Sequence, residues 1–200
     1  MKYNYIAIER EYGSGGTKIG RQLAQELGIP CYGREILEKV SEQQRIPIDQ
    51  IDKYEETVTG SFLYSLFVMG KVQNSDPDVM TREGHIYAAE QKVIRELAAQ
   101  GSSIFVGHCA SEALARHDDV LKVFILSNKE DKTKRILRDY RIPKEKVDST
   151  MNRFDKKRAN YYYANTTRRW NDYTNYDLVL NSGSLGIDGC VELLKSLIKK

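Results

Sequence analysis

Three glycines lie close together near the start of the chain, in the run Gly13-Ser14-Gly15-Gly16. They follow an apolar segment, residues 3–9, whose β-branched and aromatic side chains predict a strand. Apolar residues spaced three and four apart over residues 19–27 predict a helix after the turn. A glycine-rich turn between a strand and a helix exposes backbone N–H groups at the positive end of the helix dipole. The sequence therefore predicts that the amides of residues 13–17 cradle a phosphate chain.

This turn departs from the lysine-containing phosphate-binding pattern Gly-x4-Gly-Lys-Ser/Thr. When the strands are aligned, Gly13 and Gly15 match the inner glycines, and Gly16 stands where the lysine would be. Lys18, two positions on, or Arg10, just before the turn, is the candidate for the missing cation. The Thr17 hydroxyl is a candidate ligand for Mg²⁺. The alternative is a plain strand-to-helix turn whose glycines only allow close packing.

A second set of charged residues lies on a strongly basic predicted helix, residues 144–163. Arg153 and Lys157 are four apart and share a helical face, while Arg158 lies further round and can be oriented by Asp155. Phosphoryl transfer depends on positioning and on cations that neutralise the transferred oxygens. We predict that Arg153, Lys157 and Arg158 close over a nucleotide from a lid helix; the alternative is a solvated basic face.

Two more arginines precede this helix. Arg135 and Arg138 are three apart on a helix expected over residues 129–140, which Ser127 and Glu130 would open as a capping box. We expect the two arginines either to hold phosphates from the other side of the loop or to pair with acidic neighbours.

Further candidates lie where predicted strands end. Asn181 begins the turn after the last strand, at the edge of the sheet where open α/β sheets bind ligands. We expect it to border the nucleotide, with a simple helix-entry turn as the alternative. His108 follows Gly107 at another strand end, but three scattered histidines give no metal-binding spacing.

The elements that must position these residues alternate between strand and helix. Short apolar strands interleaved with amphipathic helices are typical of a parallel sheet covered on both faces, the α/β class. Besides the first strand, strands are predicted over residues 29–32, 103–106, 120–126 and 177–180. Further helices are predicted over residues 35–41, as a pair within 47–73, over 78–99 from a cap at Asp78, and from a cap at Asp188 to the end.

Composition narrows the class of protein. The 200 residues are 40% hydrophobic and 30% charged, which fits one packed domain and excludes a disordered chain. No run approaches the roughly 20 apolar residues of a membrane span. The three cysteines contain no Cys-x-x-Cys pair, which favours reduced, buried thiols and a cytoplasmic protein. Residues 129–169 hold 14 basic and 6 acidic residues, indicating an anionic partner there: a nucleotide, a nucleic acid or only solvent.

Six segments of the chain form a recognisable pattern when they are read in order: Ile6–Gly16, Val106–Ala110, Asp155–Tyr162, Trp170–Asp172, Tyr176–Asn181 and Leu185–Asp188. Together they resemble the cytidylate kinase-like family, from about residue 4 to residue 195. The resemblance implies a single domain, residues 1–200, with a P-loop NTPase-like three-layer fold and a five-stranded parallel sheet. It also implies an acceptor-binding helical insertion at about 33–100 and a helical lid at about 142–170. The implied activity is transfer of the γ-phosphoryl group of ATP, with Mg²⁺, to CMP or dCMP.

Two departures from established cytidylate kinases leave alternatives open. Gly16 replaces the loop lysine, and His108 stands where the family usually has arginine. The first departure raises the alternative of a nucleotide-binding regulatory protein with little or no catalysis. A nucleic-acid-binding module that uses the basic helix is the third alternative, and it ranks last because it leaves the glycine turn unexplained.

Overall fold

The computed structural model describes residues 2–51 and 82–198. Most of the two helices predicted within residues 47–73, and the cap predicted at Asp78, lie outside the described residues. No helix in the described part of the chain is long and apolar enough to cross a membrane.

The centre of the molecule is a parallel sheet of five strands in the order β2-β3-β1-β4-β5. This confirms the α/β class and the predicted sheet. In register, Ile8 of β1 lies opposite Val106 of β3 and Val123 of β4, so the carboxyl ends of the three central strands meet at one edge. The strands are β1 (Tyr5–Arg10), β2 (Cys31–Tyr32), β3 (Ser103–Val106), β4 (Val120–Leu126) and β5 (Leu178–Asn181).

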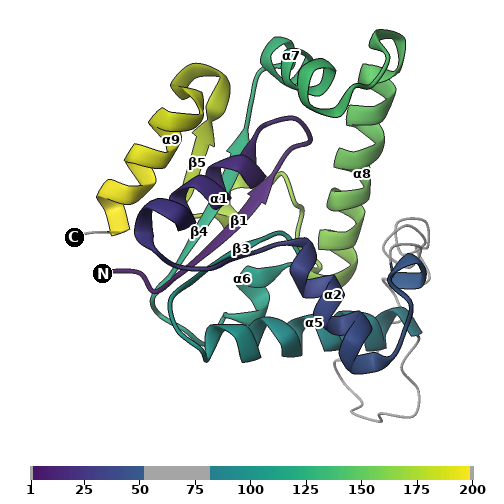
Figure 1. Ribbon diagram of the computed structural model, residues 1–200, viewed down its shortest axis with the longest axis vertical. Helices are drawn as coiled ribbons and strands as arrows, with labels where there is room; N and C mark the ends of the chain where they lie inside the picture. The colour runs from purple at the N-terminus through teal and green to yellow at the C-terminus, as the bar shows by residue number, and fades with distance from the viewer. Residues whose placement is uncertain (1, 52–81, 199–200) are drawn as a thin grey trace.

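Helices cover both faces of the sheet, as the alternation of side chains along each strand requires (Figure 1). Ile6 and Ile8 pack into one core with α1 (Gly16–Leu27) and α9 (Ser182–Ile198). Ala7 packs into a second core on the opposite face, with α2 (Arg34–Gln44), α5 (Arg82–Ala98) and α6 (Ala110–Ala113). The same alternation directs the last two residues of β1, Glu9 and Arg10, to opposite faces.

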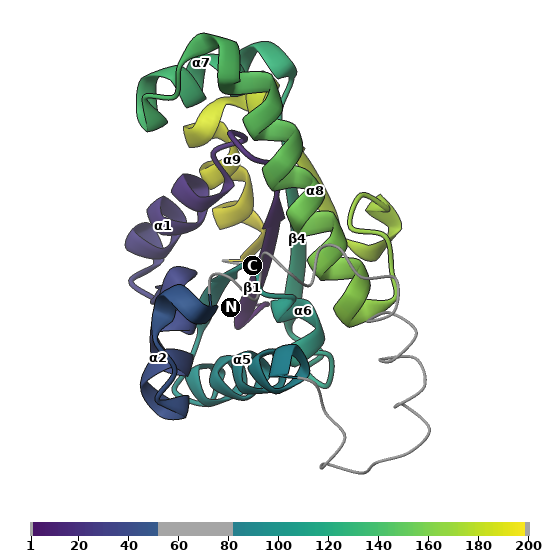
Figure 2. The same cartoon turned by 90° about the vertical axis from the view of Figure 1, so that its right-hand side faces the viewer.

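Two further helices stand over the carboxyl edge of the sheet. In Figure 1, α7 (Lys129–Tyr140) lies above the loop between β1 and α1, and α8 (Val147–Thr166) runs down beside it. Figure 2 shows α8 crossing in front of β1 and β4. A small core of Tyr12, Ile136, Val147 and Met151 joins the loop to both helices. The glycine-rich loop is therefore covered by the segment that carries most of the excess positive charge. Two short 3₁₀ turns, Lys144–Lys146 and Tyr173–Asn175, flank α8.

Helix starts differ from the prediction at two places. The capping box is wrong, because the cap of α7 is Asn128, whose side chain accepts the N–H of Asp131. The hydroxyl of Ser127 instead accepts a hydrogen bond from Arg135. The last helix begins at Ser182 rather than at Asp188, and it kinks at Gly186, where φ is +73°.

The cysteines are all free thiols, as predicted. Cys109 and Cys190 are buried, whereas Cys31 at the start of β2 is only partly buried, which differs from the expectation of three buried thiols. Burial of the Cys31 side chain raises the pKa of its thiol to about 11, which disfavours the reactive thiolate.

Candidate functional site

The loop between β1 and α1 is shaped by two glycines in the left-handed region. Gly13 has a φ of +75° and Gly15 a φ of +81°. A β-carbon on Gly13 would lie 2.9 Å from the side chain of Ile136, and one on Gly15 would lie 2.5 Å from that of Ile187. Both the backbone conformation and the space therefore require glycine at these positions.

The carbonyl groups of the loop point toward α7 and α9, and several of its amide groups point away from them. The carbonyl oxygen of Ser14 accepts hydrogen bonds from Arg135 at 3.2 Å and from the Ser182 hydroxyl at 2.5 Å. Because C=O and the next N–H point in opposite directions in a trans peptide, the N–H of Gly15 faces away from these partners. Among the described residues, nothing accepts from the amides of Gly13, Gly15, Thr17 and Lys18. These four N–H groups are therefore available to an anion, which the predicted cradle requires.

Arg135 of α7 holds the loop through hydrogen bonds to its carbonyl groups. Its Nη1 donates to the carbonyl oxygens of Gly13 and Ser14 and to the hydroxyls of Ser127 and Ser182, at 3.1–3.3 Å. Its Nη2 donates to the carbonyl oxygen of Ser182 at 3.0 Å. One guanidinium group thus joins the loop, the end of β4 and the start of α9.

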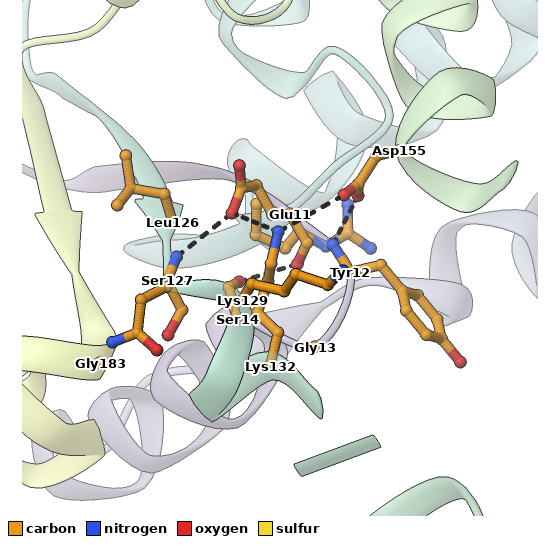
Figure 3. Close-up of polar contacts among 12 residues, drawn as sticks. Glu11, Tyr12, Gly13, Ser14, Leu126, Ser127, Lys129, Lys132, Asp155 and Gly183 are labelled. Carbon is orange, nitrogen blue, oxygen red and sulfur yellow. Dashed lines mark hydrogen bonds and ion pairs between the residues drawn. The ribbon is translucent and has the colours of Figure 1, made fainter. Parts of the chain in front are cut away.

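A second group of contacts fixes the first half of the loop to α7 and α8 (Figure 3). The Glu11 carboxylate accepts from Lys132 Nζ at 3.0 Å and from the N–H of Ser127 at 3.2 Å. The N–H of Tyr12 donates to Asp155 of α8 at 2.6 Å. The Glu11 bonds therefore tie the loop to α7 and to the end of β4, and the Tyr12 bond ties it to α8.

The Tyr12 side chain adds an aromatic contact between the loop and α8. Its ring stacks on that of Phe154 with centroids 4.5 Å apart and an angle of 6° between the planes. The ring centroids of Tyr12 and of Tyr140, on α7, lie 5.2 Å apart. Loop, α7 and α8 therefore meet in one aromatic cluster.

A small cavity of about 70 Å³ lies between the loop and the covering helices. This is well below the roughly 300 Å³ of sites that enclose a whole small molecule, so in this closed form it suits a phosphate group rather than a nucleotide. Its lining is rich in glycine and arginine: Arg10, Glu11, Gly13, Gly15, Gly16, Thr17, Lys18, Arg135, Arg138, Asp139, Tyr140, Arg158 and Ile187.

A larger cavity of about 420 Å³ lies at the sheet edge between α2 and α8. Its volume is in the range of small-molecule sites. The lining combines basic and aromatic side chains with one carboxylate: Glu9, Arg10, Arg34, Leu37, His108, Cys109, Phe154, Lys157, Arg158, Tyr161 and Tyr162.

Arg10 and Arg158 line both cavities and so mark their junction. Arg158 donates to the carbonyl oxygen of Arg10 at 2.8 Å, and the nearest oxygen of Asp155 lies 3.7 Å from it. Burial, followed by the positive charge of Arg10, lowers the pKa of Arg158 to about 10. Two guanidinium groups at one buried place attract an anion between them.

His108 enters the large cavity from a turn with three consecutive left-handed residues. Gly107, His108 and Cys109 have φ values of +85°, +58° and +51°. The Nδ1 atom of His108 lies 3.2 Å from a carboxylate oxygen of Glu90, which is fully buried. The Tyr161 hydroxyl donates to the same oxygen at 2.5 Å. The imidazole is therefore oriented by a buried carboxylate on α5.

Comparison with known families agrees with this geometry. A model of the cytidylate kinase-like family matches residues 5–184. The chain belongs to this family. A comparison with curated proteins finds no match.

Solved structures show the same fold. An uncharacterized protein from Eubacterium ventriosum is 25% identical, with a TM-score of 0.73 over 98% of both chains. A shikimate kinase from Bacteroides thetaiotaomicron is 15% identical, with a TM-score of 0.53 over 98% of both chains. This chain therefore has the same fold as that shikimate kinase.

Most of the residues predicted for the site lie close together in this structure. The small cavity brings together Arg10, Gly13, Gly15, Gly16, Thr17, Lys18, Arg135, Arg138 and Arg158. Lys157 lines the large cavity, with its ammonium group 5.6 Å from the centre of the Phe154 ring. Arg138 is largely exposed and pairs with Asp139 at 2.6 Å.

Three predicted residues are absent from the lining of these two cavities. Ser14 is buried, with its hydroxyl donating to the carbonyl oxygen of Glu11. Arg153 lies over the Phe154 ring at 5.1 Å. Asn181 accepts the N–H of Gly183 at 2.9 Å, which is the geometry of the helix-entry alternative.

Sequence reasoning missed several residues that line or support the large cavity. Glu9 is buried and accepts the indole N–H of Trp170 at 3.1 Å. Its position directly before the glycine turn was a usable signal, as was that of Arg34 at the start of the helix after β2. Glu90 gave no signal, because a single carboxylate on an amphipathic helix normally faces water.

Proposed function

We propose that this protein transfers a phosphoryl group from ATP, held at the glycine-rich loop, to an acceptor in the large cavity. The observation that carries the proposal is the junction of the two cavities at Arg10 and Arg158. A phosphoryl group passing between donor and acceptor crosses such a junction, where cations neutralise the charge on its oxygens. Membership of the cytidylate kinase-like family supports the same reaction.

The donor would lie along the loop. The free amides of residues 13–18 are assigned to its phosphates, with Lys18 and Arg138 at the rim of the small cavity. Arg135 positions the cradle through its bonds to the loop carbonyls, and Asn181 shapes the turn behind it. Lys157 and Arg158 are assigned to the transferred group, and Arg153 to the outer edge of the lid.

Mg²⁺ is the metal that this donor set suits. The described residues contain no group of three His, Cys, Asp or Glu side chains that could hold a metal by themselves. Mg²⁺ usually binds through phosphates, water and one or two side chains, and the Thr17 hydroxyl in the small cavity is the side chain we assign to it. When bound, the ion neutralises charge on the phosphates.

The acceptor we assign is a nucleoside monophosphate, CMP or dCMP by family membership. Arg34 and Lys157 offer charge for its phosphate, and Tyr161 and Phe154 offer aromatic surface for its base. One carboxylate, Glu9, lies among these cations as a candidate partner for base or sugar groups.

A coupled assay with ATP, Mg²⁺ and a panel of nucleoside monophosphates tests the proposal. We expect product formation that is fastest with CMP or dCMP and absent without Mg²⁺. Thermal unfolding of the same sample confirms that the protein is folded. Folded protein that phosphorylates no member of the panel contradicts the proposal.

Gly16, in place of the loop lysine, favours one second candidate, a nucleotide-binding regulatory protein without useful catalysis. This candidate predicts that calorimetry detects ATP binding while no phosphorylated product accumulates. Detectable transfer to any acceptor removes it.

A further inference from the structure

The side chain of Arg10 fills a slot that two glycines leave open. A β-carbon on Gly16 would lie 2.5 Å from Cβ and 2.9 Å from Cγ of Arg10. A β-carbon on Gly107, at the end of β3, would overlap Nη1 of the same arginine. The aliphatic stem therefore passes over the start of α1, and the guanidinium group lies against the end of the neighbouring strand.

The guanidinium group of Arg10 has unmet hydrogen-bonding capacity. Its Nε is buried, and within the described residues it has no hydrogen-bond partner. No carboxylate in that part of the chain forms an ion pair with Arg10, whereas a second cation, Arg158, donates to the carbonyl oxygen of Arg10 at 2.8 Å. Burying a cation without a partner is unfavourable. An anion at the junction of the cavities would satisfy both arginines.

The position of Arg10 also differs from that of Lys18, the other candidate cation. Lys18 lines only the small cavity, whereas Arg10 lines both. A group that acts on the phosphoryl while it moves from donor to acceptor must reach both sites.

We propose that Arg10 is the cation that stabilises the transferred phosphoryl group, in the role that the P-loop pattern gives to lysine. This inference rests on the proposed function. It also explains Gly16, because any side chain at position 16 would need the volume that the Arg10 stem occupies. The charge enters the site from the end of β1 instead of from the first turn of α1.

Substitutions at positions 10 and 16 test whether Arg10 takes the role that the P-loop pattern gives to lysine. Arg10→Met keeps the aliphatic stem but removes the charge, and we expect it to lower kcat about 100-fold, as loss of one transition-state donor does. Gly16→Lys alone should abolish activity because it collides with Arg10. In the double variant Arg10→Gly with Gly16→Lys, both atoms that collide with a side chain at position 16 are gone, so the lysine gains room, and activity should exceed that of Arg10→Gly by about 10-fold or more. Arg116→Ala, an exposed arginine before β4, is the matched control and should not change kcat.

A binding readout separates this inference from the proposed function. The wild-type protein should bind Mg·ATP more tightly than Mg·ADP, and Arg10→Met should lose most of that preference even if no acceptor is ever phosphorylated. A wild-type protein without transfer overturns the proposed function, while the ATP-to-ADP preference still decides the role of Arg10. Arg10→Met that keeps both kcat and the preference within about twofold overturns the inference, as does a folded double variant no better than Arg10→Gly.

Discussion

The backbone N–H of Tyr12 donates a 2.6 Å hydrogen bond to the carboxylate of Asp155, and this bond ties the glycine-rich loop to α8. Lys132 and Arg158 are the cations nearest to that carboxylate, at 3.9 and 3.7 Å. Burial nevertheless raises the pKa of Asp155, which means that the folded protein favours its protonated form more than the unfolded chain does. The contact between the loop and α8 is therefore sensitive to pH.

Asp155→Asn tests this sensitivity. A raised folded-state pKa contributes stability below the unfolded value near 3.8, and that contribution disappears as the pH rises through the folded-state value. Asparagine does not titrate but keeps an oxygen for the Tyr12 N–H. We expect the wild type to gain free energy of unfolding relative to Asp155→Asn when the pH falls from 7 to about 4, measured by urea unfolding. A difference that stays constant, or moves the other way, contradicts this account.

Arg135→Lys should destabilise the loop although it keeps the charge. Lysine cannot reproduce the fork that reaches the carbonyls of Gly13 and Ser14 and both the hydroxyl and the carbonyl of Ser182. We expect a loss of about 2–3 kcal/mol in the free energy of unfolding, since several buried carbonyl partners are left unsatisfied. Denaturant unfolding measures the loss, and calorimetry should show weaker ATP binding.

The control for this change is Arg138→Lys on the same helix. The side chain of Arg138 is 69% exposed and pairs only with Asp139 among the described residues, so its stability effect should stay below about 0.5 kcal/mol. Equal effects at the two positions would show that Arg135 does not hold the loop in the way its contacts indicate.

The loop itself was predictable from the sequence because its signal is local. Gly13 and Gly15 lie between a strand and a helix, and the two conformations that require glycine arise within that short segment. The role of Arg135 was not predictable, because its partner Gly13 is 122 positions away. Only the packing of α7 and the start of α9 against the loop assigns its guanidinium to loop carbonyls.

The last two residues of β1 likewise have some features that the sequence predicts and others that only the packing determines. Strand alternation separates Glu9 from Arg10. In the structure Glu9 contacts Trp170, and Arg10 packs against Gly16 at the start of α1. Alternation does not predict which residues contact these two side chains. Trp170 contacts Glu9 from 161 positions away, and Gly107 makes room for Arg10 from the adjacent strand.

His108 and Glu90 should be coupled in stability. Glu90 is fully buried, and removing one partner of a buried pair leaves the other poorly compensated. We expect a double-mutant cycle of His108→Asn and Glu90→Gln to give a coupling of more than about 1 kcal/mol. Asparagine is chosen because it tolerates the left-handed backbone at position 108, where φ is +58°.

A second histidine–carboxylate pair, which is more exposed, is the control for that cycle. His117 and Asp119 lie 3.9 Å apart with side chains 42% and 33% exposed, so their coupling should be below about 0.5 kcal/mol. If the two cycles give the same value, burial does not strengthen the His108 pair, and the orientation of its imidazole by Glu90 loses its support.

Lys132→Met should weaken both the fold and nucleotide binding. The ammonium group of Lys132 is mostly buried and lies 3.0 Å from the Glu11 carboxylate, at the point where the loop leaves β1. Removing it leaves the partly buried Glu11 carboxylate with the N–H of Ser127 as its remaining donor among the described residues, at an expected cost of about 1–3 kcal/mol in the free energy of unfolding. The loop should then relax, and the Kd for ATP measured by calorimetry should rise.

Lys134→Met controls for loss of charge on α7. The pair of Lys134 with Glu130 is largely exposed, with side chains 67% and 79% accessible, so its loss should cost less than about 0.5 kcal/mol and leave ATP binding unchanged. Because both changes remove one positive charge from the same helix, a general electrostatic effect on ATP would appear in both variants. A rise in Kd confined to Lys132→Met therefore assigns the effect to the loop contact, and equal rises would show that only the net charge of the helix matters.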